Sequence, residues 1–250
     1  EMDVNAKAAV LVDPDTGEIL YEKNAHAHNY PASITKVMTC LLTLEAVDRG
    51  ELSLEQVVTA SENIYTGIGE NASTADIKVG EQVRIIDLLY AALIPSANEA
   101  CNVMAEAVSG DVASFVELMN TRAAELGMAD TCFLNCTGLP ASGHLTSAHD
   151  IALMSRELIL NHPRIRDYTT IWMDSLRDGQ FQLANTNKLI RFYEGATGLK
   201  TGFTDAAGYC MSATAERDGM ELIAVILKSS TRDIRNEAAK SLLSYGFANY

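Results

Sequence analysis

The sequence predicts an α+β fold, in which one antiparallel sheet is flanked by helices and joined to a mostly helical lobe. Strand-like apolar runs occur near the two ends of the chain, and long helical patterns fill its middle. The length of 250 residues suits one large core with a second, smaller lobe. We expect a single domain over residues 1–250, with a sheet lobe at about 1–32 and 190–250 and a helical lobe at about 33–189.

The first expected element is a β-hairpin at the N-terminus. Ala8–Asp13 is a short apolar run, Pro14–Gly17 supplies turn residues, and Glu18–Tyr21 resumes a strand-like pattern. A helix is expected to open at Pro31–Ser33. Its residues Val37–Leu44 are nearly apolar on every face, which is typical of a buried helix.

Further helices are expected through the middle of the chain, because apolar residues recur with helical spacing between glycine and proline breaks. They cover Ile85–Ile94, Ser96–Val108, Asp111–Leu126 and Ser147–Leu160.

The last third of the chain changes to strands. Leu199–Phe203, Tyr209–Ala215 and Leu222–Leu227 are apolar runs separated by short turns, and Ser230–Gly246 closes the chain as a helix. We expect these strands to share one antiparallel sheet with the N-terminal hairpin.

Composition excludes several classes of protein. The chain has 19 basic and 33 acidic residues, and a net charge of −14 disfavours nucleic acid as a partner. No apolar run is long enough to cross a membrane. The five cysteines and five histidines show no metal-ligand spacing, so the sequence predicts no metal and no cofactor.

The first candidate motif pairs Ser33 with Lys36. Residues three apart lie on one face of a helix, and the first turn of a helix favours developing negative charge. Burial at this apolar helix would lower the pKa of Lys36 and make it a base toward the serine hydroxyl. A capping serine beside a surface lysine is the alternative.

The second candidate motif is Ser96-Ala97-Asn98, which follows the helix-stopping Pro95. Between two helices, a hydroxyl and an amide can face a cleft, relay a proton and hold a peptide group. An ordinary N-cap serine is the alternative.

The third candidate motif is Lys200-Thr201-Gly202. A lysine inside a central strand is costly without a partner or a role, and a glycine lets a ligand approach the backbone closely. Lys200 would place positive charge near Lys36 and could bind an anionic substrate. An edge strand with a solvated lysine is the alternative.

Together, the motifs S-x-x-K, S-x-N and K-T-G form the set of the penicillin-binding proteins and class A β-lactamases. Nearly the whole chain resembles the catalytic domain of the low-molecular-mass penicillin-binding proteins, the serine D-alanyl-D-alanine carboxypeptidases. The resemblance implies a β-lactamase/transpeptidase-like fold and hydrolysis of peptidoglycan stem peptides through an acyl-enzyme.

Carried over residue by residue, the resemblance implies roles for the first two motifs. Ser33 matches the acylated nucleophile and Lys36 matches its base. Ser96 and Asn98 match the second motif, in which the serine relays a proton to the leaving D-alanine.

The third motif is implied to bind substrate, with Lys200, Thr201 and Gly202 at the matching positions. The resemblance also implies an oxyanion hole made by the backbone N–H groups of Ser33 and Phe203.

Arg235 best matches an arginine that holds the substrate's terminal carboxylate, and Arg232 is second. The implied partners are stem peptides ending in D-Ala-D-Ala and β-lactam antibiotics.

Two other functions remain open. A class A β-lactamase needs a glutamate that activates the deacylating water, and Thr131 stands at the nearest matching position. A non-catalytic β-lactam sensor or wall-binding domain could keep the serine without turnover. We expect a carboxypeptidase that β-lactams acylate.

The resemblance also predicts location. We expect an extracytoplasmic protein, at the cell surface or in the periplasm, from which a signal peptide has been removed. A full-length form anchored to the membrane through a further C-terminal segment is a further expectation.

Overall fold

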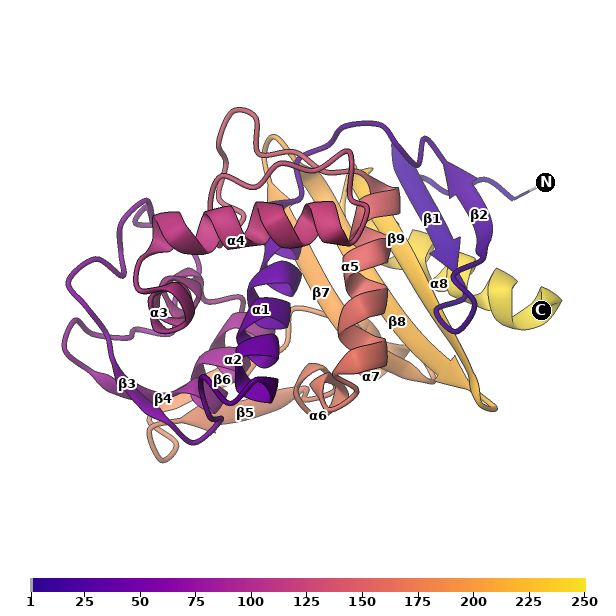
Figure 1. Ribbon diagram of the computed structural model, residues 1–250. Helices are drawn as coiled ribbons and strands as arrows, with labels where there is room; N and C mark the ends of the chain where they lie inside the picture. The colour runs from indigo at the N-terminus through magenta and orange to yellow at the C-terminus, as the bar shows by residue number, and fades with distance from the viewer. Residues whose placement is uncertain (1) are drawn as a thin grey trace.

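The computed structural model describes residues 2–250, and its centre is a five-stranded antiparallel sheet (Figure 1). The strand order is β2-β1-β9-β8-β7, so the last strand of the chain lies between the N-terminal hairpin and the other C-terminal strands. The predicted α+β fold with one shared sheet is confirmed. The strands are β1 (Ala8–Val12), β2 (Ile19–Lys23), β7 (Ala196–Thr204), β8 (Gly208–Arg217) and β9 (Met220–Ser229).

Both faces of this sheet are covered, which explains why its inner strands are continuous apolar runs. In β1, Val10 belongs to the larger core, which the sheet shares with the helical region. Leu11 belongs to the smaller core on the opposite face, which the sheet shares with the C-terminal helix. The helix α5 (Ala148–Asn161) packs on one face and α8 (Arg232–Asn249) on the other (Figure 1). Successive side chains of a strand point to opposite faces of the sheet, so alternate residues of each strand pack into the two different cores.

The helix α1 (Lys36–Asp48) is the axis of the helical region, and ten of its 13 residues are buried. It contacts α2 (Ile85–Leu93), α3 (Asn98–Ser109) and α4 (Val112–Glu125), as well as α5. The prediction of a buried helix is confirmed. Because most of α1 is buried, its buried polar side chains, such as those of Lys36 and Thr39, need internal partners.

Two boundaries near the motifs differ from the predictions. Ser33 lies in a 3₁₀ turn, η1 (Ala32–Thr35), and the α-helix begins only at Lys36. Ser96 lies before α3 rather than inside it, with φ +65°, and α3 begins at Asn98. A left-handed backbone cannot continue into a right-handed helix, so the serine stays in the connection.

Several short elements were not predicted, because three to five residues are too few for a reliable hydrophobic period. Two small antiparallel sheets lie away from the main one, each made of two strands. One pairs β3 with β4, and the other pairs β5 with β6. These elements are β3 (Val57–Thr59), β4 (Gln82–Arg84), α6 (Ile165–Thr169), β5 (Met173–Leu176), β6 (Phe181–Ala184) and α7 (Leu189–Phe192).

The five cysteines are all free thiols. Four of them are buried and Cys132 is exposed. Among residues 2–250, no helix combines the length and the apolar character needed to cross a membrane. The division into a sheet lobe and a helical lobe at the expected boundaries stays a prediction.

Candidate active site

Ser33 and Lys36 lie together where η1 joins α1. Lys36 Nζ is 2.7 Å from Ser33 Oγ, and the lysine side chain is completely buried while the serine is partly exposed. The alternative of a surface lysine is therefore wrong. The hydroxyl faces the cleft, and the amine approaches it from inside the protein.

The surroundings of Lys36 suit a neutral amine. Its Nζ lies 2.9 Å from Asn98 Oδ1 and 2.8 Å from the backbone oxygen of Thr137. Both of these oxygens are acceptors, so they take the two N–H bonds of a neutral amine. The third contact of Nζ is with Ser33 Oγ, and in the neutral state the lone pair of the amine can accept the hydroxyl hydrogen there, as a base does from its nucleophile.

Burial also lowers the pKa of the Lys36 ammonium, because the charged form loses its hydration. No carboxylate forms an ion pair with Lys36 among the described residues. The Glu99 carboxyl acts in the opposite direction and favours the charged form, but the effect of burial is larger. The amine therefore loses its proton at a lower pH than an exposed lysine does.

Asn98 is fixed from both sides. Its Nδ2 donates to the backbone oxygen of Ser73 at 3.1 Å, which leaves Oδ1 for Lys36. Ser96, two residues earlier, has a buried Oγ without a hydrogen-bond partner in the described part of the chain. An unpartnered buried hydroxyl at a strained backbone position is ready for a substrate group.

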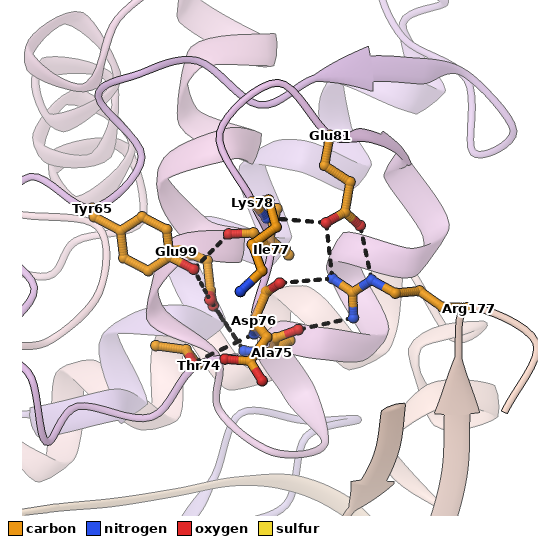
Figure 2. Close-up of polar contacts among 9 residues, drawn as sticks. All are labelled: Tyr65, Thr74, Ala75, Asp76, Ile77, Lys78, Glu81, Glu99 and Arg177. Atoms are coloured by element: carbon orange, nitrogen blue, oxygen red, sulfur yellow. Dashed lines mark hydrogen bonds and ion pairs between the residues drawn. The ribbon is translucent and has the colours of Figure 1, made fainter. Parts of the chain in front are cut away.

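Figure 2 shows how the segment after Ser73 is held beside this motif. The buried carboxylate of Glu99 accepts from the backbone N–H of Ala75 at 3.1 Å and lies 3.1 Å from the hydroxyl of Tyr65. From the other side, Arg177 donates to the backbone oxygen of Ala75 at 3.0 Å. Burial raises the pKa of the Glu99 carboxyl.

The third motif lies on β7, which is an edge strand and not a central one. Lys200 is nevertheless only 1% exposed, because η1 and α1 pack against this strand. Its Nζ donates to the backbone oxygen of Thr201 at 2.9 Å. Burial holds its pKa well below the usual range, and a proton on the nearby Lys36 would lower it further. The expected central position of the strand is therefore wrong, although Lys200 is buried as that expectation implied. The alternative was right about an edge strand and wrong about a solvated lysine.

Gly202 is required by close approach of two backbones. A Cβ at this position would lie 2.9 Å from the backbone nitrogen of Ser33 and 3.1 Å from Ala32 Cβ. Glycine therefore lets β7 pass directly beside the nucleophile. The next residue, Phe203, is half exposed and stacks on Tyr209, with ring centroids 4.3 Å apart.

Arg235 is a buried guanidinium with no carboxylate partner among the described residues. It is 3% exposed, donates from Nε to Asn236 Oδ1 at 3.1 Å, and lies 5.8 Å from the Tyr209 ring centroid. Burial and the neighbouring Arg232 lower its pKa to about 10. Such a group is free to bind a ligand carboxylate.

These groups meet at a cleft of about 400 Å³. Its walls carry hydroxyl, amide and cationic side chains but no aspartate or glutamate. Lys36, Asn98 and Lys200 lie behind the wall rather than on it. The lining residues are Ser33, Ser73, Ser96, Ala184, Asn185, Thr186, Lys188, Thr201, Gly202, Phe203, Tyr209, Arg232 and Arg235.

Sequence reasoning gave no role to Ser73, Thr137 or Thr186. The first two act through backbone oxygens, which any residue type supplies, so no side-chain pattern marks them. Thr186 Oγ1 lies 2.5 Å from Thr201 Oγ1 and orients that hydroxyl. Lys188 lines the cleft, and its positive charge was not singled out.

Comparisons with known proteins find similar sequences over nearly the whole chain. The family described as D-alanyl-D-alanine carboxypeptidase matches residues 1–231. D-alanyl-D-alanine carboxypeptidase DacF of Bacillus subtilis is 41% identical over 253 residues, which cover 100% of this chain and 64% of DacF. DacC of Escherichia coli is 34% identical over 98% of this chain and 62% of its own length. The chain thus spans less than two thirds of these relatives.

Solved structures show the same fold. Penicillin-binding protein D2 from Listeria monocytogenes, in its cefotaxime-bound form, has a TM-score of 0.89 at 34% identity, with 99% of each chain covered. Penicillin-binding protein 6B from Escherichia coli has a TM-score of 0.94 at 31% identity, over 100% of this chain and 79% of that one.

Proposed function

Because the chain belongs to the D-alanyl-D-alanine carboxypeptidase family, we propose that it removes the terminal D-alanine from peptidoglycan stem peptides through an ester on Ser33. The observation that carries the proposal is the 2.7 Å contact between Ser33 Oγ and a buried Lys36 amine whose other two contacts accept its N–H bonds. This is a Ser-Lys variant of nucleophile and base.

In the acylation step, Lys36 takes the hydroxyl proton while Ser33 Oγ forms a bond to the carbonyl carbon of the D-Ala-D-Ala peptide. Negative charge develops on the carbonyl oxygen, where we assign the backbone N–H groups of Ser33 and Phe203 as donors. The proximity of Gly202 to Ser33 N supports this assignment, because it brings β7 beside the nucleophile.

Collapse of the tetrahedral intermediate breaks the C–N bond, and the leaving amine needs a proton. Ser96, whose buried hydroxyl lacks a protein partner, is assigned to pass this proton from Lys36 to the departing D-alanine. Asn98 holds the amine in place through Oδ1. Water then attacks the ester and releases the shortened stem peptide.

The terminal carboxylate of the substrate fits the cationic end of the cleft. Arg235 and Thr201 both line the cleft, and within residues 2–250 Arg235 forms no ion pair with an acidic side chain. Lys200 does not line the cleft, so we assign the direct contact with the carboxylate to Arg235 and Thr201 rather than to Lys200.

We further propose that β-lactams acylate Ser33 and are released slowly. The wall of the cleft carries no carboxylate that could activate a deacylating water. Thr131, at the position where a β-lactamase would have its glutamate, donates instead to Asp150 at 2.6 Å and does not line the cleft. This arrangement favours a β-lactam target over a β-lactamase.

The proposed substrate is a cell-wall component, so we propose that the protein works outside the cytoplasmic membrane. Removal of a signal peptide and attachment through a further C-terminal segment stay predictions.

Mass spectrometry after incubation with penicillin tests the nucleophile. The protein should gain one penicillin mass per chain, on the peptide that contains Ser33. The Ser33→Ala variant should lose the adduct, whereas Ser73→Ala, in the same cleft, should keep it because Ser73 contributes only its backbone oxygen to Asn98. An adduct that survives Ser33→Ala would exclude this mechanism.

Release of D-alanine from a peptide ending in D-Ala-D-Ala separates the enzyme from a sensor. A carboxypeptidase turns over many peptides for each chain. A protein that binds penicillin on Ser33 but releases no D-alanine would instead be a sensor or wall-binding domain.

A further inference from the structure

Three metal-ligating side chains from distant parts of the sequence converge on the surface near the first turn of α5, away from the cleft. They are His26, Asp130 and His149, and each offers a ligand atom within 4.8 Å of the other two. His26 Nδ1 is 2.8 Å from Asp130 Oδ2, and the two imidazole ring centroids are 4.4 Å apart. No motif spacing marks this cluster, because His26 and Asp130 are 104 residues apart in the sequence.

We propose that His26, Asp130 and His149 bind one divalent transition-metal ion, with Zn²⁺ as the best match. Two imidazoles and one carboxylate are a donor set of zinc sites that keep a fourth position for water. Bonds of about 2.0–2.2 Å bring such ligand atoms to roughly 3.3 Å from one another. Small side-chain rotations reach that spacing, because His26 is 63% exposed and the other two are partly exposed.

The surroundings of His149 support this assignment. Its Nδ1 lies 3.0 Å from Asp150 Oδ1, so the hydrogen is on Nδ1 and the lone pair of Nε2 is free for a metal. Asp150 is itself buried and fixed, since it accepts from the backbone N–H of Asp130 at 2.8 Å and from Thr131 Oγ1 at 2.6 Å. A metal-ligating histidine usually has this kind of carboxylate behind it.

The other two ligands are also positioned. Ser147 Oγ donates to Asp130 Oδ2 at 2.8 Å, which holds the carboxylate at the start of α5. The backbone N–H of His149 donates to the oxygen of Ala25 at 2.9 Å and brings the His26 segment alongside the helix. An ion at this site would therefore join three separate segments of the folded chain. An unfolded chain lacks the site, so the ion would stabilise the fold.

Calorimetric titration of the chelator-treated chain with Zn²⁺ tests the proposal directly. We expect one Zn²⁺ per chain and a higher midpoint of thermal unfolding with Zn²⁺ than without it. Each of His26→Ala, Asp130→Asn and His149→Gln should weaken the affinity by at least about 10-fold, the lower limit for perturbing a metal's surroundings. His26 is exposed, so His26→Ala keeps the fold and the test does not depend on buried variants.

Two matched control variants test for nonspecific binding of Zn²⁺ to other exposed side chains. His28→Ala removes an exposed histidine from the same segment, and Cys132→Ser removes the exposed thiol. Both should bind Zn²⁺ like the parent. Equal binding by parent and His149→Gln, equal stabilisation by Mg²⁺, or loss of binding in Cys132→Ser would each overturn the proposal. Neither measurement uses the activity of the cleft.

Discussion

At the level of single residues, we expect Lys36 to determine when the cleft can react, because in the proposed mechanism only its neutral form can take the hydroxyl proton of Ser33. Burial lowers the pKa of this lysine from 10.5. The second-order rate of acylation by penicillin should therefore rise with pH and level off below the pH at which an exposed lysine would titrate. The measurement is the rate of adduct formation across the pH range in which the protein stays folded.

Lys36→Arg is the sharpest variant for this prediction. Arginine keeps the positive charge but is not deprotonated in proteins, so it provides no base. The acylation rate should fall by about 10² to 10⁴, the usual contribution of a general base. A variant that keeps the parent's rate would show that Lys36 serves packing alone.

Arg235 should matter for peptides more than for substrates without a terminal carboxylate. A charge-assisted bond to a carboxylate contributes about 1.5–3 kcal/mol. Arg235→Ala should then lower kcat/KM for D-Ala-D-Ala peptides by about 10- to 100-fold, since roughly 1.4 kcal/mol is a factor of ten. A thioester without the carboxylate should react almost as before, and equal losses on both substrates would make Arg235 structural.

At the level of elements, Arg177 connects the β5–β6 turn to the segment that carries Ser73. It donates to the backbone oxygens of Ala75 and Asp76 and to the carboxylate of Glu81 (Figure 2). Arg177→Ala should lower the free energy of unfolding by about 1–3 kcal/mol, because several partly buried acceptors lose their donor at once.

The loss of Arg177 should also slow acylation, since Ser73 would no longer hold Asn98 as firmly. Arg84→Ala is the matched control. Arg84 bonds the carboxylates of Glu55 and Asp87, but it is about half exposed, so its loss should cost under about 1 kcal/mol. Denaturant unfolding and penicillin acylation measure the two effects. Equal changes in both variants would contradict the assigned role.

The long elements were predictable because their hydrophobic patterns extend over many residues. The buried helix α1, the hairpin and the three C-terminal strands all follow from composition and turn residues. The β5–β6 hairpin was missed although Asp178-Gly179 is a hairpin signal, because strands of four largely exposed residues give no clear period. The position of β7 at the edge was not predictable, since strand order depends on the packing of the whole sheet.

The candidate site residues were predicted on a different basis. Side-chain chemistry and spacing singled out Ser33 and Lys36, and the family resemblance added Arg235, whereas backbone oxygens such as that of Thr137 leave no mark in the sequence. The same limit applies to Gly202, whose close approach to Ser33 appears only when two distant segments are folded together.

Across the whole molecule, stability should depend on pH through His144, which links the Leu134 loop to η1. Its Nδ1 accepts from the backbone N–H of Leu134 at 2.9 Å, and Nε2 lies 2.9 Å from Thr35 Oγ1. Burial lowers its pKa from 6.5 to about 4. As the pH drops, His144 therefore binds a proton at a higher pH in the unfolded chain than in the folded one. The free energy of unfolding falls as a result between about pH 6.5 and about pH 4.

The protonation of His144 should lower the free energy of unfolding by about 3 kcal/mol in total. This loss is complete at a pH below both pKa values and is absent above about pH 6.5. Denaturant unfolding at several pH values measures it. The His144→Gln variant, although less stable, should lose this part of the pH dependence. An unchanged slope in the variant would assign the acid sensitivity to other groups.

The burial of four thiols has a consequence for the redox chemistry of the chain. Oxidation proceeds through the thiolate, and burial raises the thiol pKa of both Cys101 and Cys210 to about 11. Folded molecules should thus resist peroxide and disulfide exchange at these positions, even in an oxidising compartment. Only Cys132 is open to solvent, so two chains can be joined through a single disulfide without disturbing the buried sulfur atoms beside Lys36.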